Sequence, residues 1–177
     1  KVTPDTRIIY AEGSDLAEGI HNLSPIPSRY LLTPDGIQGA LGEYFDNREM
    51  KGEPVFTRVD DNIDFYWEHL SPRYDMPDDD FGIRWTTYLV PPETGTYYLG
   101  SWGSSGYEIL LDDKKLISSR SDDSGFHIEV PADLKAGQKY KIEVLYKNYA
   151  GDADIKLLWA RPRVNLVENA VKASKEA

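Results

Sequence analysis

The sequence predicts an all-β fold, an antiparallel β-sandwich, and three observations carry this prediction. Aromatic residues, which favour strands, are frequent: 12 Tyr, 4 Trp and 5 Phe among 177 residues. The 14 Gly and 11 Pro interrupt short apolar segments, as turns between short strands do. Residues 139–146 alternate apolar and polar side chains, which indicates a strand with one face in the core. A chain of this length is expected to form one main domain.

The candidate strands of this β module follow one another between Gly39 and Arg161. They are short apolar or alternating segments bounded by turn residues: 41–45, 55–59, 63–67, 81–90, 95–102, 107–111, 115–118, 125–130, 139–148 and 154–160. Asp112 and Asp113 stand between two apolar segments and predict a hairpin turn. Residues 133–137 predict a second turn.

The two ends of the chain carry different patterns. Residues 7–12 form a short apolar strand candidate, followed by a proline-containing connection. After Pro162, apolar residues recur at spacings of three and four, which predicts the start of a helix. A lone strand and a lone helix do not make separate cores, so both are expected to be edges of a host α/β domain. The predicted division is a host segment and linker over 1–38, the β-sandwich over 39–162, and a host helix over 163–177.

Charge and composition exclude several classes of partner. The chain has 30 acidic and 20 basic residues, and its formal net charge of -10 would repel nucleic acid and anionic membranes alike. No apolar run approaches the roughly 18 residues needed to span a bilayer. We therefore expect neither a nucleic acid nor a membrane partner. The absence of cysteine excludes disulfides and thiolate metal sites but leaves the cellular compartment open.

The sequence carries no recognisable catalytic or cofactor motif. His21, His69 and His127 lack the spacing of metal ligands, and neither a phosphate-binding loop nor a serine nucleophile elbow is present. The three aspartates 78–80 are interpreted as a solvated turn before Phe81, with calcium binding as the alternative use. Carboxylates are so frequent that chance pairs are expected, and they do not identify a glycosidase site. The sequence predicts no catalytic residue, no metal and no cofactor.

Aromatic residues beside polar loops are the candidates for ligand binding. Sugar rings present apolar C–H faces that stack on aromatic rings, while their hydroxyls need polar neighbours. Trp102 and Tyr107 flank a loop that contains Ser104 and Ser105, and Tyr74 belongs to another loop. We expect these five residues to contact carbohydrate. The other tryptophans are expected in the sandwich core: Trp67, Trp85 and Trp159.

Seven motifs in a fixed order carry a resemblance to a known family. They are GEYFDN at 42–47, GEPV at 52–55, RVD at 58–60, IDFYW at 63–67, DDFGIRW at 79–85, GTYY at 95–98 and LLDD at 110–113. Together they resemble the fourteen-kilodalton domain (PA14) family named after the protective antigen of anthrax toxin, over residues 40–162. This resemblance implies a β-sandwich, in agreement with the strand pattern.

The flanking segments are similar to a second family. Residues 6–13 (TRIIYAEG) and 170–177 (AVKASKEA) look like the second, α/β domain of family 3 glycoside hydrolases, whose β-glucosidases often carry a PA14-type insertion there. The resemblance implies a retaining β-glucosidase or β-xylosidase as the parent protein. The family's nucleophile is an Asp in a Ser-Asp-Trp motif, which this chain lacks, and the acid/base Glu usually lies beyond the point where the chain stops. The fragment is therefore expected to be catalytically silent.

For the module, the resemblance implies a wall near the active-site mouth that shapes aglycone specificity. The implied partners are a β-linked oligosaccharide or aryl glycoside and the catalytic domains of the parent chain. A periplasmic or secreted parent is favoured over a cytoplasmic one. Gly39 and Pro162 are expected to lie near one another, because an insertion leaves and re-enters its host at adjacent points.

Two alternatives stand beside this interpretation. The first is an autonomous lectin or adhesin domain. Yeast adhesins of the family hold calcium with two adjacent aspartates after the strand that corresponds to 95–101, but here the loop 102–106 reads WGSSG. Calcium is therefore not expected. The second alternative, a self-contained glycosidase, requires hydrolysis by this fragment alone.

Overall fold

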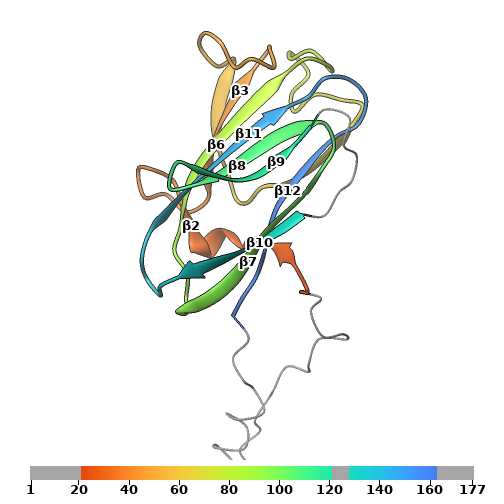
Figure 1. Cartoon of the computed structure of the whole chain (residues 1–177). Helices are drawn as coiled ribbons and strands as arrows, with labels where there is room; N and C mark the ends of the chain where they lie inside the picture. The colour runs from red at the N-terminus through yellow and green to blue at the C-terminus, as the bar shows by residue number, and fades with distance from the viewer. Residues whose placement is uncertain (1–20, 121–127, 163–177) are drawn as a thin grey trace, which may run out of the picture.

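The computed structural model describes residues 21–120 and 128–162 and shows two antiparallel β-sheets that form a sandwich (Figure 1). The predicted all-β fold class is confirmed. The strand expected at 7–12, the helix expected after Pro162, and His127 lie outside the described residues. No helix within the described ranges is long and apolar enough to cross a bilayer.

All strand pairs within the described ranges are antiparallel. In the described ranges the elements are β1 (Ser24–Pro25), the 3-10 helix η1 (Ser28–Tyr30), β2 (Leu31–Leu32), β3 (Ala40–Phe45), β4 (Phe56–Asp60), β5 (Asp64–Glu68), β6 (Gly82–Leu89), β7 (Gly95–Gly103), β8 (Gly106–Leu111), β9 (Lys114–Ser119), β10 (Ile128–Leu134), β11 (Tyr140–Lys147) and β12 (Ala153–Ala160). One sheet has five strands in the order β1-β12-β7-β10, with β5 also paired to β12. The other has seven in the order β4-β3-β6-β11-β8-β9, with β2 also paired to β6.

Each of the ten candidate strands corresponds to one strand from β3 to β12, with ends that differ by a few residues. Two details of the prediction were wrong. The stretch after residue 13, interpreted as a long connection, contains β1, η1 and β2, and it buries Ile26 and Leu31 in the core. The turn expected from residue 133 starts later, because β10 continues through Pro131 to Leu134. Proline is tolerated there because β10 lies at the edge of its sheet.

The core forms where the inward faces of the two sheets meet. In β11, which lies between β6 and β8, Ile142, Val144 and Tyr146 alternate with solvent-facing residues and are at most 1% exposed. Trp85 and Trp159 are buried and Trp67 packs against the core, as predicted. The aromatic rings pack in two groups, one around Phe65, Trp67 and Trp85 and one around Tyr97 and Trp159.

A buried carboxylate organises one side of this core. Asp60, 7% exposed, accepts hydrogen bonds from the Tyr44 hydroxyl (2.5 Å), Trp85 Nε1 (2.7 Å) and Arg58 Nε (2.5 Å). Burial and the Asp60 carboxylate raise the pKa of Tyr44, so its hydroxyl stays protonated and donates. Gly42 leaves room for this group of residues, because a Cβ there would lie 2.8 Å from the Asp60 carboxylate. We call Asp60, Tyr44, Trp85 and Arg58 the Asp60 cluster.

The hairpin predicted at Asp112 and Asp113 is confirmed. Both residues have positive φ, 48° and 63°, as a two-residue turn between β8 and β9 requires. The Asp112 carboxylate also accepts the backbone N–H of Lys141 at 2.9 Å, which ties the turn to β11. These aspartates therefore have a local structural use.

The described chain enters and leaves the sandwich through paired strands. β1 pairs with β12, with Ser24 opposite Trp159, and both lie at the same end of the molecule (Figure 1). Beyond β12, Pro162 lies against Gly95, the first residue of β7, since a Cβ at Gly95 would lie 2.8 Å from the Pro162 ring. Adjacent entry and exit is the geometry that an inserted domain needs. The division of the chain at residues 39 and 162 stays a prediction.

Candidate functional site

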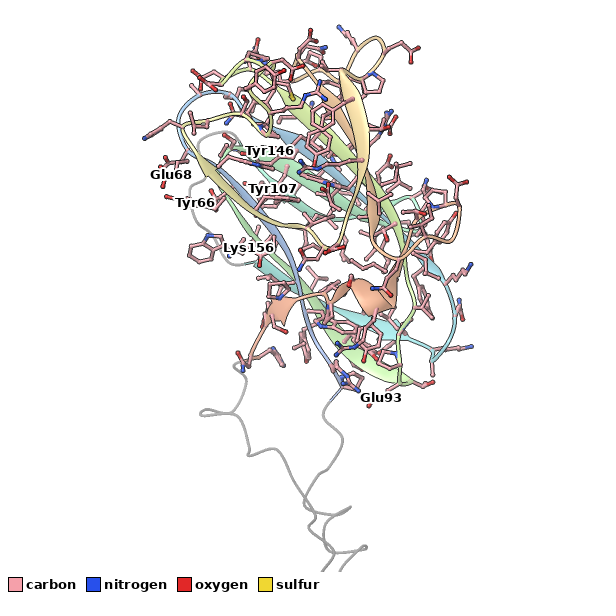
Figure 2. The ribbon with its side chains drawn as sticks, turned by 180° about the vertical axis from the view of Figure 1, so that it is seen from behind. Tyr66, Glu68, Glu93, Tyr107, Tyr146 and Lys156 are labelled. Carbon is pink, nitrogen blue, oxygen red and sulfur yellow. The ribbon has the colours of Figure 1, made fainter. Side chains whose placement is uncertain are left out.

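The loop between β7 and β8, predicted from the sequence to contact carbohydrate, is largely buried. Tyr107 is 2% exposed, and its hydroxyl lies 3.0 Å from Ser101 Oγ; Figure 2 shows it inside the sandwich. Ser105 is 6% exposed and has a φ of 66°. Tyr107 occupies an inward position of β8, two residues before the equally buried Ile109. Tyr107 and Ser105 are therefore buried, and their predicted contact with carbohydrate would require this loop to open.

Ser104 is tied to the loop between β11 and β12. Its backbone N–H donates to Asp154 Oδ1 (2.9 Å), and its hydroxyl donates to the Asp152 carbonyl (2.6 Å). Asp152 and Asp154 thus lie beside this loop although they are about 50 positions away in the sequence. No local sequence pattern predicts that they are neighbours. The described residues contain no group of three or more His, Asp or Glu side chains arranged to hold a metal ion.

A polar group is buried beneath this loop. Asn148 is fully buried, and its side chain lies close to the buried Tyr146 hydroxyl, which also faces Ser104 and Ser105. Burial raises the pKa of Tyr146 to about 12. A neutral buried phenol with a raised pKa holds its proton at ordinary pH. Figure 2 shows Tyr146 in the interior, so this group is not a surface site.

Trp102 is open to solvent and belongs to a larger surface. It is 41% exposed, while its neighbour Ser101 is fully buried, so Trp102 projects from the outer face of the five-stranded sheet. The residue opposite it on β12 is Lys156, and the residue opposite Lys156 on β5 is Asp64. Lys156 Nζ and Asp64 Oδ1 lie 2.8 Å apart. Trp102 therefore begins a row of outward side chains that crosses three strands.

A second aromatic ring shares this surface. Tyr66 lies two residues after Asp64 on β5, opposite Asp154, and is 65% exposed. Figure 2 shows Tyr66, Glu68 and Lys156 along the same side of the sandwich. We call Trp102, Lys156, Asp64 and Tyr66 the aromatic face. Tyr66 was missed as a candidate, although the alternation in IDFYW, with Phe65 and Trp67 inward, indicates that it points outward.

The N-terminal part of the described chain covers a neighbouring portion of this sheet surface, around Tyr98 and Gly100. The His21 ring stacks on Tyr98 at 3.3 Å between ring centroids, and its Nδ1 lies 2.9 Å from Glu129 Oε1. Leu23 covers Gly100, where a Cβ would lie 2.5 Å from Leu23 Cδ1. This segment does not reach the aromatic face, where Trp102 and Tyr66 stay exposed.

The fifth candidate, Tyr74, lies apart from Trp102. Its side chain is 97% exposed and therefore contacts almost nothing. The preceding residue, Arg73, places its guanidinium 3.8 Å from the Phe56 ring on β4, which belongs to the seven-stranded sheet. The nearby aspartates 78–80 are exposed, as the solvated-turn interpretation predicts. Tyr74 is a solvent-exposed aromatic residue without a surrounding surface.

Comparison with known proteins settles the family. The sequence model of the PA14 domain matches residues 36–170. The chain belongs to the PA14 domain family. The resemblance found in the ordered motifs is thereby confirmed, and so is the β-sandwich that it implies.

Two curated proteins are similar to this PA14 domain. The anti-sigma-I factor RsgI3 of Acetivibrio thermocellus is 31% identical over 150 residues, which cover 78% of this chain and 22% of that protein. A xylan 1,4-beta-xylosidase of Xylanibacter ruminicola is 28% identical over 126 residues, covering 66% of this chain and 14% of that protein. The chain thus spans less than a quarter of the length of either relative.

Among solved structures, the beta-glucosidase of Kluyveromyces marxianus in complex with glucose has the same fold. The TM-score is 0.67 at 15% identity, and the superposition covers 93% of this chain and 22% of the glucosidase. At this identity the likeness concerns the fold alone. PA14 sandwiches therefore occur both in a regulatory protein and in glycosidases.

Proposed function

We propose that this PA14 domain is a non-catalytic carbohydrate-binding module of a larger protein. The observation that carries the proposal is the half-exposed Trp102, beside an ion pair and a second exposed aromatic ring on the outer face of one sheet. An aromatic ring supplies an apolar stacking surface, and neighbouring charged groups supply hydrogen bonds to hydroxyls. The Asp60 carboxylate is 7% exposed and already accepts three hydrogen bonds. We therefore do not assign it a role as a catalytic acid or base.

More narrowly, we propose that the host is a family 3 glycoside hydrolase, a β-glucosidase or β-xylosidase, in which the module shapes the aglycone side of the active-site mouth. Three observations support this host. One relative is a xylosidase, the glucosidase superposition covers 93% of the chain, and the paired strands β1 and β12 suit an insertion. The partners would then be the catalytic domains of the parent and a β-linked oligosaccharide or aryl glycoside.

A second candidate is a carbohydrate-sensing module of a regulatory protein, related to an autonomous lectin-type domain. The 31% identity to an anti-sigma factor supports it. The two candidates differ in the host and not in the ligand chemistry of the module. They are separated by hydrolysis: the full-length parent cleaves aryl β-glycosides if it is a glycosidase and does not if it is a regulator.

The experiment that tests the proposed function uses the 177-residue chain itself. In native gels cast with soluble xylan or mixed-linkage β-glucan, migration should be retarded relative to gels without polysaccharide. The same preparation should release no nitrophenol from aryl β-glucosides or β-xylosides. Unretarded migration in every polysaccharide contradicts carbohydrate binding. Hydrolysis that survives repurification and disappears with one Asp or Glu substitution contradicts the non-catalytic assignment.

A further inference from the structure

We propose that the aromatic face binds an extended, uncharged polysaccharide chain that crosses β7, β12 and β5, with Trp102 and Tyr66 stacking on different sugar units. The inference rests on the proposed carbohydrate function and adds the location of the site and the class of ligand. It moves the site from the β7–β8 loop, where the sequence had suggested it, to the outer face of the five-stranded sheet.

The strand register places the two aromatic residues on one surface. Residues that face each other in an antiparallel pair project to the same side of a sheet. Lys156 faces Trp102 on one side and Asp64 on the other, and Asp154 faces Tyr66. Trp102 and Tyr66 therefore both project outward, one on each side of β12.

The spacing between these residues exceeds one sugar ring. Two strand spacings separate β7 from β5 and two residues separate Asp64 from Tyr66, so the Cα atoms of Trp102 and Tyr66 lie about 12 Å apart by ideal strand geometry. A single pyranose ring does not reach across that distance. One ligand that contacts both rings must be an oligosaccharide or a longer chain in an extended conformation.

The polar groups between the aromatic rings suit a carbohydrate better than a protein. The core of a protein interface is depleted of charged residues, whereas here the centre is the Lys156–Asp64 ion pair, with side chains 38% and 33% exposed. Lys156 offers donors and Asp64 offers acceptors, which together match hydroxyl groups. The large exposed apolar side chains in this row, Trp102 and Tyr66, are aromatic and not aliphatic.

Charge indicates which carbohydrates fit. Asp64 stands on this surface beside one cation, Lys156, and the exposed Glu68 ends the same strand as Asp64. Asp154 is 8% exposed and its carboxylate accepts the backbone N–H of Ser104, so it adds no exposed charge. The whole chain carries a formal net charge of -10. A polyuronate would meet like charge at the site and along the approach to it, while an uncharged glycan would not. Neutral β-linked chains are therefore the expected ligands.

The test measures the affinity of the 177-residue chain by isothermal titration calorimetry, with xylohexaose and cellohexaose as neutral probes, xylobiose as a short probe, and polygalacturonate as a charged probe. We expect Trp102→Ala and Tyr66→Ala each to weaken hexaose binding by about tenfold or more, as the loss of one stacked ring implies. Trp102→Phe should retain part of the affinity. Tyr74→Ala, which removes an even more exposed ring away from this face, should leave it unchanged.

Chain length gives an independent readout. Xylobiose is too short to reach both rings, so its binding should be weaker than that of xylohexaose, and at most one of the two alanine variants should reduce it. Thermal melting of each variant establishes that it is folded, which is expected because both side chains are substantially exposed.

The outcomes separate the two proposals. Binding of the unsubstituted chain that survives both alanine substitutions contradicts the site and leaves the proposed function standing. Tighter binding to polygalacturonate than to the neutral hexaoses contradicts the uncharged ligand class. A chain that binds none of the four probes contradicts the proposed function, and the site with it.

Discussion

Two regions of this domain combine aromatic rings with an ion pair, one inside the sandwich and one outside. In the Asp60 cluster, Tyr44, Trp85 and Arg58 all donate to one buried carboxylate. In the aromatic face, Trp102 and Tyr66 lie beside the Lys156–Asp64 pair, whose side chains are about one third exposed. The residue types are similar. The polar groups of the Asp60 cluster are hydrogen-bonded to one another inside the sandwich, while those of the aromatic face are accessible to a ligand.

The comparison teaches that burial, and not residue type, assigns a role to each aromatic residue here. Leaving a buried acceptor without its donors, or buried donors without their acceptor, lowers the free energy of unfolding. An exposed pair stabilises the fold only weakly. Substitutions in the Asp60 cluster should therefore change stability, and substitutions in the aromatic face should change binding.

The largest expected difference is between two tryptophans. Trp85→Ala removes a fully buried ring and should lower the free energy of unfolding by about 3 to 5 kcal/mol. Trp102→Ala removes a ring that is 41% exposed, and the loss should be about 1 kcal/mol or less. Urea unfolding followed by far-UV circular dichroism measures both. Equal losses would break the distinction between the two regions.

The next effect concerns the buried carboxylate. Asp60→Ala leaves the Tyr44 hydroxyl and the Trp85 N–H without their acceptor and should cost about 3 kcal/mol. The matched control is Asp61→Ala, at an exposed position one residue later, for which we expect a change within about 0.5 kcal/mol. A loss of the same size at both positions would show that charge, and not the hydrogen-bonded cluster, sets the stability.

The pH dependence of stability should reveal the buried tyrosines. The pKa of Tyr146 is raised to about 12 in the folded chain from 10.0, so between these values the folded state binds more protons than the unfolded state. Its contribution to stability is therefore complete below pH 10 and is lost as the pH rises toward 12. As the pH rises from 10 to 12, the free energy of unfolding of Tyr146→Phe should fall by about 2 kcal/mol less than that of the unsubstituted chain. An unchanged alkaline slope in the urea unfolding of this variant would contradict the raised pKa.

The smallest stability effect should come from the exposed ion pair. The double substitution of Lys156 and Asp64 by Ala is expected to change the free energy of unfolding by less than about 1 kcal/mol, because solvent screens a pair at this exposure. The same variant should bind xylohexaose more weakly, since it loses the donors and acceptors between the rings. A large loss of stability with unchanged binding would reverse the roles assigned to the two regions.

The sequence predicted the strands well because two-residue alternation is a local signal. It separated the long strands of both sheets, but it missed β1 and β2, which have two residues each and too few positions to show a period. The buried Ile26 follows β1 and the buried Leu31 belongs to β2, and the short apolar stretches around them show no period. The family motifs supplied the sandwich that links the strands.

The candidate site was predictable only in part. The sequence around Trp102, with Gly and Ser beside it, lacks the alternating apolar neighbours of a core strand, and the residue is indeed half exposed. Tyr107 was selected because it flanks a loop, but it alternates with Ile109 along β8, and both side chains are buried. The neighbourhood of Trp102, Lys156 and Asp64 depends on the pairing of β7, β12 and β5, and no local pattern fixes that pairing.

The most direct measurement of the central claim follows the indole N–H signals of the four tryptophans by heteronuclear NMR while xylohexaose is added. Our account predicts a progressive shift of the Trp102 signal, with little change at Trp67, Trp85 and Trp159, which belong to the core. Tyr66→Ala should reduce the shift at equal ligand concentration. Binding with a stationary Trp102 signal would contradict the assignment of the aromatic face as the carbohydrate site.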